Sequence, residues 1–434
     1  MSYKIAFFSD THLGYAAKCR NNSSGINMRN VDGLLGLRET VTQILKEEDI
    51  DLVLHGGDFF HRSQPAIAEI VFANRQLGRL SKAGIPVIGA TGNHDFANDK
   101  SKSPATAALD DPDRNINMVT APYEIFKPVE GVNIHVISHL GLLSAERIIP
   151  EPIDGEINIF TTHGAAQVPG HEVFACLDSP GEAVIGYDVL TLPWTATLLG
   201  HYHGMGTLPG FESGLGQAWY AGSLLRRGFS DPEGGRGWLL ATIHDDGHVT
   251  VEPRYVSQRP QFDLQFIDAT GLTGQEVEER MRENLSRVDV TDAIIRQRVI
   301  NCSLPTRRGV DLKSLGNITE KSLVWQPEFI RPAELDFADE SVHDLAVASL
   351  STAGSSDLPG MFSNWFAGFA ERSAIPQEIR PVVEESGIQL LKSVSAGVES
   401  GVAEASEEMN KKKSQTAVAV EEPADPFGEN GGNV

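Results

Sequence analysis

The sequence has few cysteines, no long apolar run and a deficit of positive charge. Its three cysteines, Cys19, Cys176 and Cys302, lie far apart and lack CxxC spacing. This usage argues against disulfides and a thiolate zinc site and favours a reducing compartment. No stretch reaches about 18 uninterrupted apolar residues, so we expect no transmembrane helix. An apolar strand begins almost directly after Met1 and leaves no room for a signal peptide. We therefore expect a cytoplasmic protein, or a protein of the host cytoplasm if the source is viral.

Basic residues are scarce relative to acidic ones. The 434 residues include 36 lysines and arginines against 59 acidic residues, for a net charge of −23. The imbalance is uneven, because residues 336–434 hold 17 acidic and 6 basic side chains. This argues against a protein that coats DNA through a broad basic surface. It leaves room for an enzyme that contacts DNA through a local patch or with a partner, since divalent ions would offset acidic ligands locally.

A chain of this length is expected to form two or three domains. In the first 90 residues, apolar runs of strand length alternate with segments of helical periodicity, at 3–9, 31–48, 51–55, 65–81 and 85–90. Such alternation predicts βαβ units and a parallel sheet. The next part is strand-rich, with runs at 132–138, 157–162, 195–200, 217–221, 237–243 and 249–255. A second sheet packed on the first fits this half best.

Composition changes divide the chain further. We expect a first domain at 1–258, followed by a small α/β domain at 259–333 with strands near 262–268, 294–300 and 323–325 and a capping box at Thr273–Glu276. Residues 334–410 are rich in Ala, Ser, Glu and Gly and allow two amphipathic helices, one with a stripe of Phe362, Trp365, Phe366 and Phe369. The acidic tail at 411–434 lacks apolar periodicity and is expected to be disordered.

Potential metal ligands follow five apparent strands. They are Asp10 and His12, Asp58, Asn93 with His94, His163, and His201 with His203. Ligands bind beyond the carboxyl ends of strands in open α/β sheets, so these loops could converge. One Asp-x-His alone is most often structural, but five such stretches in one chain predict a metal centre. Imidazoles, carboxylates and an amide oxygen suit manganese, iron or zinc better than magnesium. Two ions roughly 3.5–4 Å apart can support displacement at phosphorus, and Asp58 is the obvious bridging carboxylate.

In order and spacing these motifs resemble the signature of the calcineurin-like metallophosphoesterases. They read Asp10-x-His12, Gly57-Asp58, Gly92-Asn93-His94-Asp95, His163 and Gly200-His201-x-His203. The resemblance implies a four-layer αββα sandwich with two divalent ions, most readily Mn²⁺, with Mg²⁺, Fe²⁺ or Zn²⁺ as alternatives. It assigns one ion to Asp10, His12, Asp58 and His203, and the other to Asp58, Asn93, His163 and His201. It leaves His94 to stabilise the phosphoryl group or leaving oxygen, with Asp95 orienting its imidazole.

The second motif narrows the resemblance. A protein phosphatase would read GDxxDRG, whereas this chain has His61 in Gly57-Asp58-Phe59-Phe60-His61-Arg62. That resembles the SbcD-like (Mre-eleven-type) exonucleases, as do Tyr220-x-Gly222-Ser223 and the small α/β domain, which is similar to that family's DNA-capping domain. The resemblance implies that His61 helps direct exonuclease cleavage. It implies action on DNA ends in double-strand-break repair and recombination, an SMC-like coiled-coil ATPase partner and a homodimer.

Several alternatives remain open. The same metal site could serve a phosphomonoesterase or cyclic-nucleotide phosphodiesterase, although such enzymes have no need of the region 260–410. The aromatic stripe that includes Phe366 could dock on the ATPase or belong to an ordinary packed helix. Lys18, Arg20 and Arg29 could contact phosphates or be solvated. Gly222 could serve only to turn the chain after a strand.

Overall fold

The computed structural model describes residues 2–17, 19–96, 103–171, 183–213 and 216–331, and a few single positions between 363 and 389. The chain divides into two units, Met1–Glu334 and Leu335–Val434, and nearly all described residues belong to the first. Most of the predicted helical region at 334–410 and the whole tail at 411–434 lie outside the described residues. Of the aromatic stripe only Phe366 is described, and it is buried.

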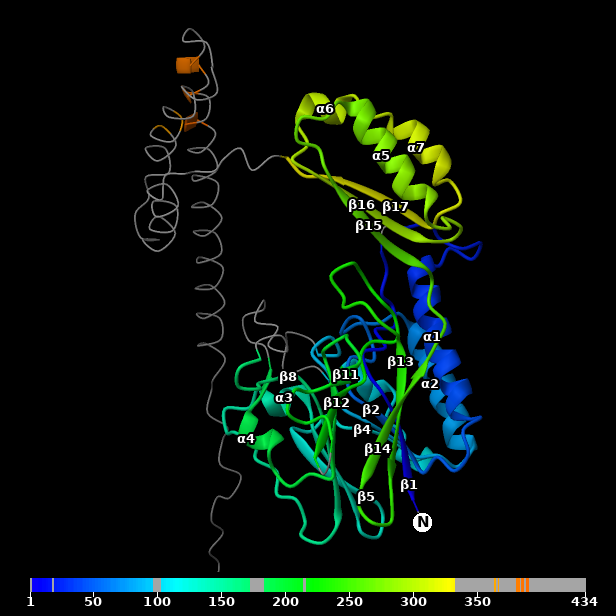
Figure 1. The fold of residues 1–434 in the computed structure, drawn as a ribbon. Coiled ribbons are helices and arrows are strands. Elements are labelled where there is room, and N and C mark those ends of the chain that lie inside the picture. Colours follow the sequence, from blue (N-terminus) through cyan, green and yellow to red (C-terminus); the bar gives the residue numbers. More distant parts are fainter. Residues whose placement is uncertain are drawn as a thin grey trace, which may run out of the picture. The chain divides into compact units, whose positions relative to one another are not determined.

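The first sheet has the strand order β14-β13-β1-β2-β3-β4 (Figure 1). Strands β1 to β4 pair in parallel and are linked in part by two long helices, as the periodicity predicts. The runs at 237–243 and 249–255 differ from expectation, because they join this sheet instead of the second. Strand β13 pairs antiparallel with β1, and β14 pairs antiparallel with β13. The elements are β1 (Tyr3–Phe8), α1 (Met28–Ile44), β2 (Leu52–His55), α2 (Ile67–Lys82), β3 (Val87–Gly89), β4 (Ile116–Met118), β13 (Gly237–Ile243) and β14 (Val249–Tyr255).

The second sheet has the order β11-β12-β10-β7-β6-β5. Its central strands are parallel, and the edge strands β5 and β11 are antiparallel. Strand β5 has no clear sequence signal because it is an exposed edge strand that carries Glu124, Lys127 and Pro128. The strands are β5 (Tyr123–Val129), β6 (Val132–Ile137), β7 (Ile157–His163), β10 (Ala196–Gly200), β11 (Gly206–Thr207) and β12 (Gln217–Tyr220).

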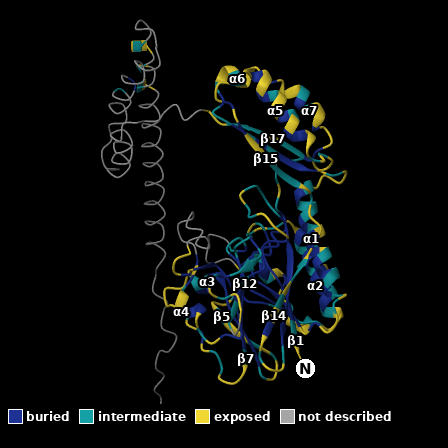
Figure 2. Cartoon of the chain, in the orientation of Figure 1, coloured by how far each residue is buried: buried dark blue, intermediate teal, exposed yellow. Residues whose placement is uncertain are grey.

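The two sheets pack face to face with helices on the outer faces. Phe7 and Leu54 of the first sheet and Leu198 of the second belong to one buried cluster between them. The outer face of the first sheet packs on α1 and α2, and that of the second on short helices and loops. Figure 2 shows the buried strands between more exposed helices. The four αββα layers are thus confirmed. The remaining elements are α3 (His139–Leu142), α4 (Tyr187–Leu190), β8 (Ala165–Ala166), β9 (Val184–Ile185) and 3-10 helices at Ala105–Ala108 and Pro112–Arg114.

A small α/β region follows with its own apolar core. Its three parallel strands have the order β15-β16-β17. Helix α5 begins with the expected capping box, in which Thr273 Oγ1 accepts from the Glu276 N–H and the Glu276 carboxylate accepts from the Thr273 N–H. The elements are β15 (Gln261–Asp268), α5 (Gly274–Ser286), β16 (Ile294–Ile300), α6 (Leu304–Arg308), α7 (Leu312–Ile318) and β17 (Val324–Phe329).

A network of ion pairs links α1 to the start of this region. Asp32 accepts two hydrogen bonds from Arg259, at 2.8 and 2.7 Å, and one from the buried Arg29 at 2.7 Å. Arg20 pairs with Asp292 at 2.6 Å. Two of the three cations that the sequence offered as phosphate contacts, Arg20 and Arg29, therefore serve internal ion pairs. The third, Lys18, lies outside the described residues.

Two expectations from the sequence concern membrane helices and disulfides. Within the described ranges every helix is too short or too polar to cross a bilayer. Cys19 and Cys302 are free thiols, and Cys176 lies outside the described part of the chain.

We predict that Asp32→Ala lowers the free energy of unfolding by about 3–5 kcal/mol, because it leaves the buried Arg29 without its carboxylate. Urea unfolding followed by tryptophan fluorescence measures the change. The control is Asp292→Ala, whose ion pair with Arg20 is more than half exposed and should contribute less than about 1 kcal/mol. Equal losses in the two variants would contradict a special role for Asp32.

Candidate metal centre

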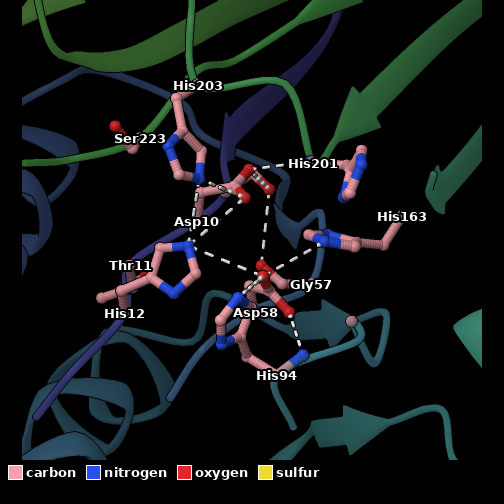
Figure 3. A network of polar contacts seen from close by, with 12 residues as sticks. Asp10, Thr11, His12, Gly57, Asp58, His94, His163, His201, His203 and Ser223 are labelled. Carbon is pink, nitrogen blue, oxygen red and sulfur yellow. Dashed lines mark hydrogen bonds and ion pairs between the residues drawn. The ribbon is translucent and has the colours of Figure 1, made fainter. Parts of the chain in front are cut away.

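The loops after β1, β2, β3, β7 and β10 meet at one end of the two sheets. Strands β1, β2 and β3 are neighbours in the first sheet, and β7 and β10 are neighbours in the second. Their carboxyl ends therefore deliver polar side chains to a common place. Figure 3 shows that the side chains of Asp10, His12, Asp58, His163 and His203 point toward one another.

Two buried carboxylates form the middle of this cluster. Asp58 Oδ2 lies 3.3 Å from His163 Nε2 and 3.5 Å from His12 Nε2. Asp10 Oδ1 lies 3.5 Å from His203 Nε2 and 3.7 Å from His12 Nε2. His12 Nε2 and His203 Nε2 are themselves only 3.2 Å apart. Imidazole nitrogens and carboxylate oxygens thus face a shared centre.

The donor set fits divalent cations. Asp10 Oδ1 is buried and has no hydrogen-bond partner, and a buried carboxylate oxygen is costly unless a donor or a cation satisfies it. Candidate ligand atoms fall within 4.8 Å of one another in the groups Asp10, His12 and His203, and Asp10, Asp58 and His163. These atoms are of the kinds that bind manganese, iron or zinc.

The charges of the cluster are mutually dependent. Burial raises the pKa of Asp58, but the charge and hydrogen bond of His163 and the charge of His12 outweigh it and hold that pKa far below its usual value. Burial lowers the pKa of His163, but Asp58 and Asp10 raise it to about 9. Burial lowers the pKa of His12 to about 3. The carboxylates are therefore ionised, as coordination of a cation requires.

Hydrogen bonds at the far ring nitrogen orient three histidines. Nδ1 lies 2.8 Å from the Gly56 carbonyl oxygen in His163 and 3.0 Å from Asp231 Oδ1 in His203. In His94, Nδ1 lies 3.0 Å from the His61 carbonyl oxygen. Each acceptor holds a proton on Nδ1, so that Nε2 is the nitrogen that faces the centre. The sequence does not identify Asp231 as a partner of His203, because it lies 28 residues further along the chain in a Ser-Asp-Pro turn.

Asn93 and His201 complete the predicted set. Asn93 Oδ1 lies 3.0 Å from His163 Nε2. The ring of His201 packs edge-on against that of His163, with centroids 5.2 Å apart. The backbone N–H of His201 donates to Asp10 Oδ2. The structure therefore brings together all seven residues that the sequence offers as metal ligands: Asp10, His12, Asp58, Asn93, His163, His201 and His203.

The backbone at this site is strained. Asp10, His12 and Asp58 have φ values of 50°, 44° and 54°, a conformation that costs about 1–3 kcal/mol at a non-glycine residue. Hydrogen bonds from the Asp10 N–H to the Gly57 carbonyl and from the His12 N–H to the Asp58 carbonyl hold the two loops together. A side chain at Gly92 would overlap the Asp58 carboxylate, so only glycine allows this close approach.

His94 and His61 form a stacked pair at the edge of the cluster. Their ring centroids are 5.2 Å apart with an interplanar angle of 19°. The His94 side chain is 34% exposed, and its Nε2 lies 4.0 Å from Asp58 Oδ2. Burial, followed by the positive charges of His94 and Arg227, lowers the pKa of His61 to about 4. Two imidazoles therefore lie where a phosphate could reach both them and the carboxylates.

The expectation that Asp95 orients the imidazole of His94 is wrong. The His94 ring is fixed by the His61 carbonyl. The buried carboxylate of Asp95 instead accepts from the N–H groups of Gly92, Phe59 and Phe60, at 3.0, 3.3 and 3.0 Å. Asp95 thus ties the loop after β3 to the loop after β2 and supports His94 only through the backbone.

The resemblance read from the motifs is confirmed by comparison with known proteins. Residues 3–194 match the family described as calcineurin-like phosphoesterase. The chain is 26% identical over 296 residues to the DNA double-strand break repair protein Mre11 of Haloferax volcanii, covering 67% of this chain and 60% of that protein. The protein of the same name from Sulfurisphaera tokodaii is 26% identical over 208 residues, covering 46% and 49%. The chain thus spans about half or somewhat more of these relatives' length.

Solved structures also resemble the chain. A dimetal phosphatase from Danio rerio is 13% identical with a TM-score of 0.32, covering 56% of this chain and 93% of that one.

We predict that Asp95→Asn lowers the free energy of unfolding by about 1–3 kcal/mol, because its amide NH₂ would face one of three backbone N–H donors. Urea unfolding measures the loss, and metal content should stay near that of the unsubstituted protein. Asp188→Asn, at an exposed ion pair with Arg147, is the control and should change stability by less than about 1 kcal/mol. Unchanged stability in Asp95→Asn would refute the role of Asp95 in joining the loops.

Proposed function

We propose that the chain, which matches the calcineurin-like phosphoesterase family over residues 3–194, is a metal-dependent nuclease that hydrolyses phosphodiester bonds at DNA ends. The observation that carries the proposal is the pair of buried carboxylates, Asp10 and Asp58, surrounded by imidazole Nε2 atoms. Phosphoester hydrolysis follows from the family. The choice of DNA as substrate is supported by the relatives, which are DNA double-strand break repair proteins, and by the small α/β region at 261–329.

The ligand assignment is also a proposal. Asp10, His12, Asp58 and His203 would hold one ion, and Asp58, Asn93, His163 and His201 the other, so that Asp58 serves both. Mn²⁺ suits this mixture of imidazole and oxygen donors best, and Mg²⁺, Fe²⁺ and Zn²⁺ are alternatives. Bound divalent ions would polarise the phosphoryl oxygens and lower the pKa of water.

His94 is suited to act on the phosphate directly. Its Nδ1 donates to the His61 carbonyl, so Nε2 is the nitrogen left for the phosphate. In the imidazolium form, Nε2 can donate a hydrogen bond to a phosphoryl oxygen or give its proton to the leaving oxygen. His61 stacks on His94 and carries no hydrogen bond at Nδ1. As the resemblance to the SbcD-like exonucleases implies, His61 would help direct exonuclease cleavage.

The partners are also a proposal, supported by the relatives of this chain that are DNA double-strand break repair proteins. We propose that the chain works in double-strand-break repair with an SMC-like coiled-coil ATPase, and that residues after 334 provide the contact. Co-purification of the ATPase with the full chain, compared with a chain ending at 334, tests this. Equal recovery of the ATPase with both would remove the proposed contact.

The substrate is tested with the purified protein, Mn²⁺ and two substrates in parallel, linear duplex DNA and a chromogenic phosphate ester. The nuclease proposal expects shortening or nicking of the DNA. Turnover of the chromogenic ester with intact DNA would favour the second candidate, a two-metal phosphomonoesterase or cyclic-nucleotide phosphodiesterase.

We predict that His94→Ala lowers the rate of DNA hydrolysis by at least about 100-fold while metal content stays near that of the unsubstituted protein, because His94 acts on the phosphate and not on the ions. Elemental analysis after gel filtration measures the metal, and a gel assay measures the rate.

The matched control is Asp58→Ala, which removes the shared carboxylate and should lose both ions together with activity. Loss of metal in His94→Ala, or one tightly held ion in Asp58→Ala, would mean that the ligands are assigned wrongly.

A further inference from the structure

The segment between β12 and β13 passes beside the candidate metal centre and carries Arg227. The backbone of Arg227 is held on both sides by side chains. Its N–H donates to Asp231 Oδ2 at 2.7 Å, and its carbonyl accepts from the Tyr15 hydroxyl at 2.5 Å. The position of this residue is thus fixed independently of its guanidinium group.

The Arg227 guanidinium and the Asp231 carboxylate both approach Nδ1 of His203. Arg227 Nη2 lies 3.1 Å from His203 Nδ1, and Asp231 Oδ1 lies 3.0 Å from the same nitrogen. A guanidinium can only donate. When His203 Nε2 faces Asp10 as a ligand does, Nδ1 carries the proton and donates to Asp231. In that state His203 offers Arg227 no acceptor.

The neighbouring arginines of the segment have other partners. Arg226 pairs with Glu233 at 3.7 Å, and Arg236 donates to the carbonyls of His203 and Pro232. In the part of the chain that the structure describes, no carboxylate lies within ion-pair distance of the Arg227 guanidinium. Its charge also reaches His61 and His12, since it contributes to the pKa of each. Arg227 is therefore a cation with a fixed backbone whose guanidinium lies beside His203, at the edge of the candidate metal centre.

We propose that Arg227 binds the phosphate group of the substrate, at the scissile phosphodiester or the phosphate next to it. This deepens the proposed function and rests on it. The planar fork of a guanidinium matches two phosphate oxygens and forms charge-assisted hydrogen bonds. The chain thereby supplies a positive charge to the substrate in addition to the ions, at a site rich in carboxylates.

Two substitutions test the proposal, Arg227→Gln and Arg227→Lys. Both leave the backbone hydrogen bonds to Asp231 and Tyr15 in place. Binding of a fluorescein-labelled duplex with a single-stranded end is measured by anisotropy with Ca²⁺ in place of Mn²⁺, over a series of salt concentrations. Arg227→Gln should weaken binding by about 10- to 100-fold and reduce the slope of log K against log salt by about 0.7–0.9, as loss of one phosphate contact requires. Arg227→Lys should keep the slope and lose part of the affinity.

The control is Arg147→Gln, which removes an equal charge from an exposed pair with Asp188 and should change neither quantity. Metal content should be the same in all variants. A wild-type affinity and salt slope in Arg227→Gln would overturn the proposal, and so would loss of metal, which would mean that Arg227 acts through His203.

A failure of the nuclease proposal can be distinguished from a failure of the Arg227 proposal. If the unsubstituted protein neither binds nor cleaves DNA but turns over a chromogenic phosphate, the nuclease proposal fails. Inorganic phosphate as a competitive inhibitor of that turnover then tests Arg227. The inhibition constant should rise about 10-fold or more in Arg227→Gln, and an unchanged constant would overturn the inference.

Discussion

The two buried carboxylates of Asp10 and Asp58 are the constraint on which the rest of the site depends. Each is taken out of water at the end of a strand, where its charge is tolerable only beside positive charge or strong donors. Imidazoles from His12, His163 and His203 gather around them for this reason. Asp10 Oδ1 still lacks a hydrogen-bond donor. A site assembled in this way is matched to a cation and is less stable without one.

The rest of the fold offsets the backbone strain at this site. Left-handed backbone at Asp10, His12 and Asp58 is unfavourable, and it persists because the loops are held on several sides. Hydrogen bonds between the loops after β1 and β2, and the three N–H groups that converge on Asp95, provide that support. The large apolar cores on both faces of the first sheet stabilise the fold and so offset the backbone strain at these residues. Strain at the ligands and rigidity beneath them are therefore parts of one arrangement.

The sequence predicts which side chains meet at the candidate metal centre. It does not predict the hydrogen-bond partners of those side chains. Asp58 or His163 can be found because each follows an apolar run, and parallel strands bring their carboxyl ends together. The acceptor for His94 could not be found, because it is a backbone carbonyl and every residue has one. The same limit made Asp95 look like the partner of His94, since it is adjacent in the chain. Asp231 and Arg227 depend on a long segment after β12 returning to the site, which no local pattern encodes. The placement of β13 and β14 in the first sheet is likewise a matter of long-range pairing.

The negative net charge is compatible with an anionic substrate because some arginines form ion pairs within the chain, whereas Arg227 forms none with the described residues. Arg20, Arg29 and Arg259 serve pairs with Asp32 and Asp292, so they strengthen the molecule without adding to its attraction for phosphate. Arg227 differs because its backbone is held while Asp231 accepts from the His203 nitrogen that the Arg227 guanidinium also approaches. Asp231 therefore has two effects on the site. By accepting from His203 it aims Nε2 at the cluster, and by the same hydrogen bond it leaves Arg227 available. The proposed ligand orientation of His203 and the proposed phosphate recognition by Arg227 are thus linked through a single ring nitrogen.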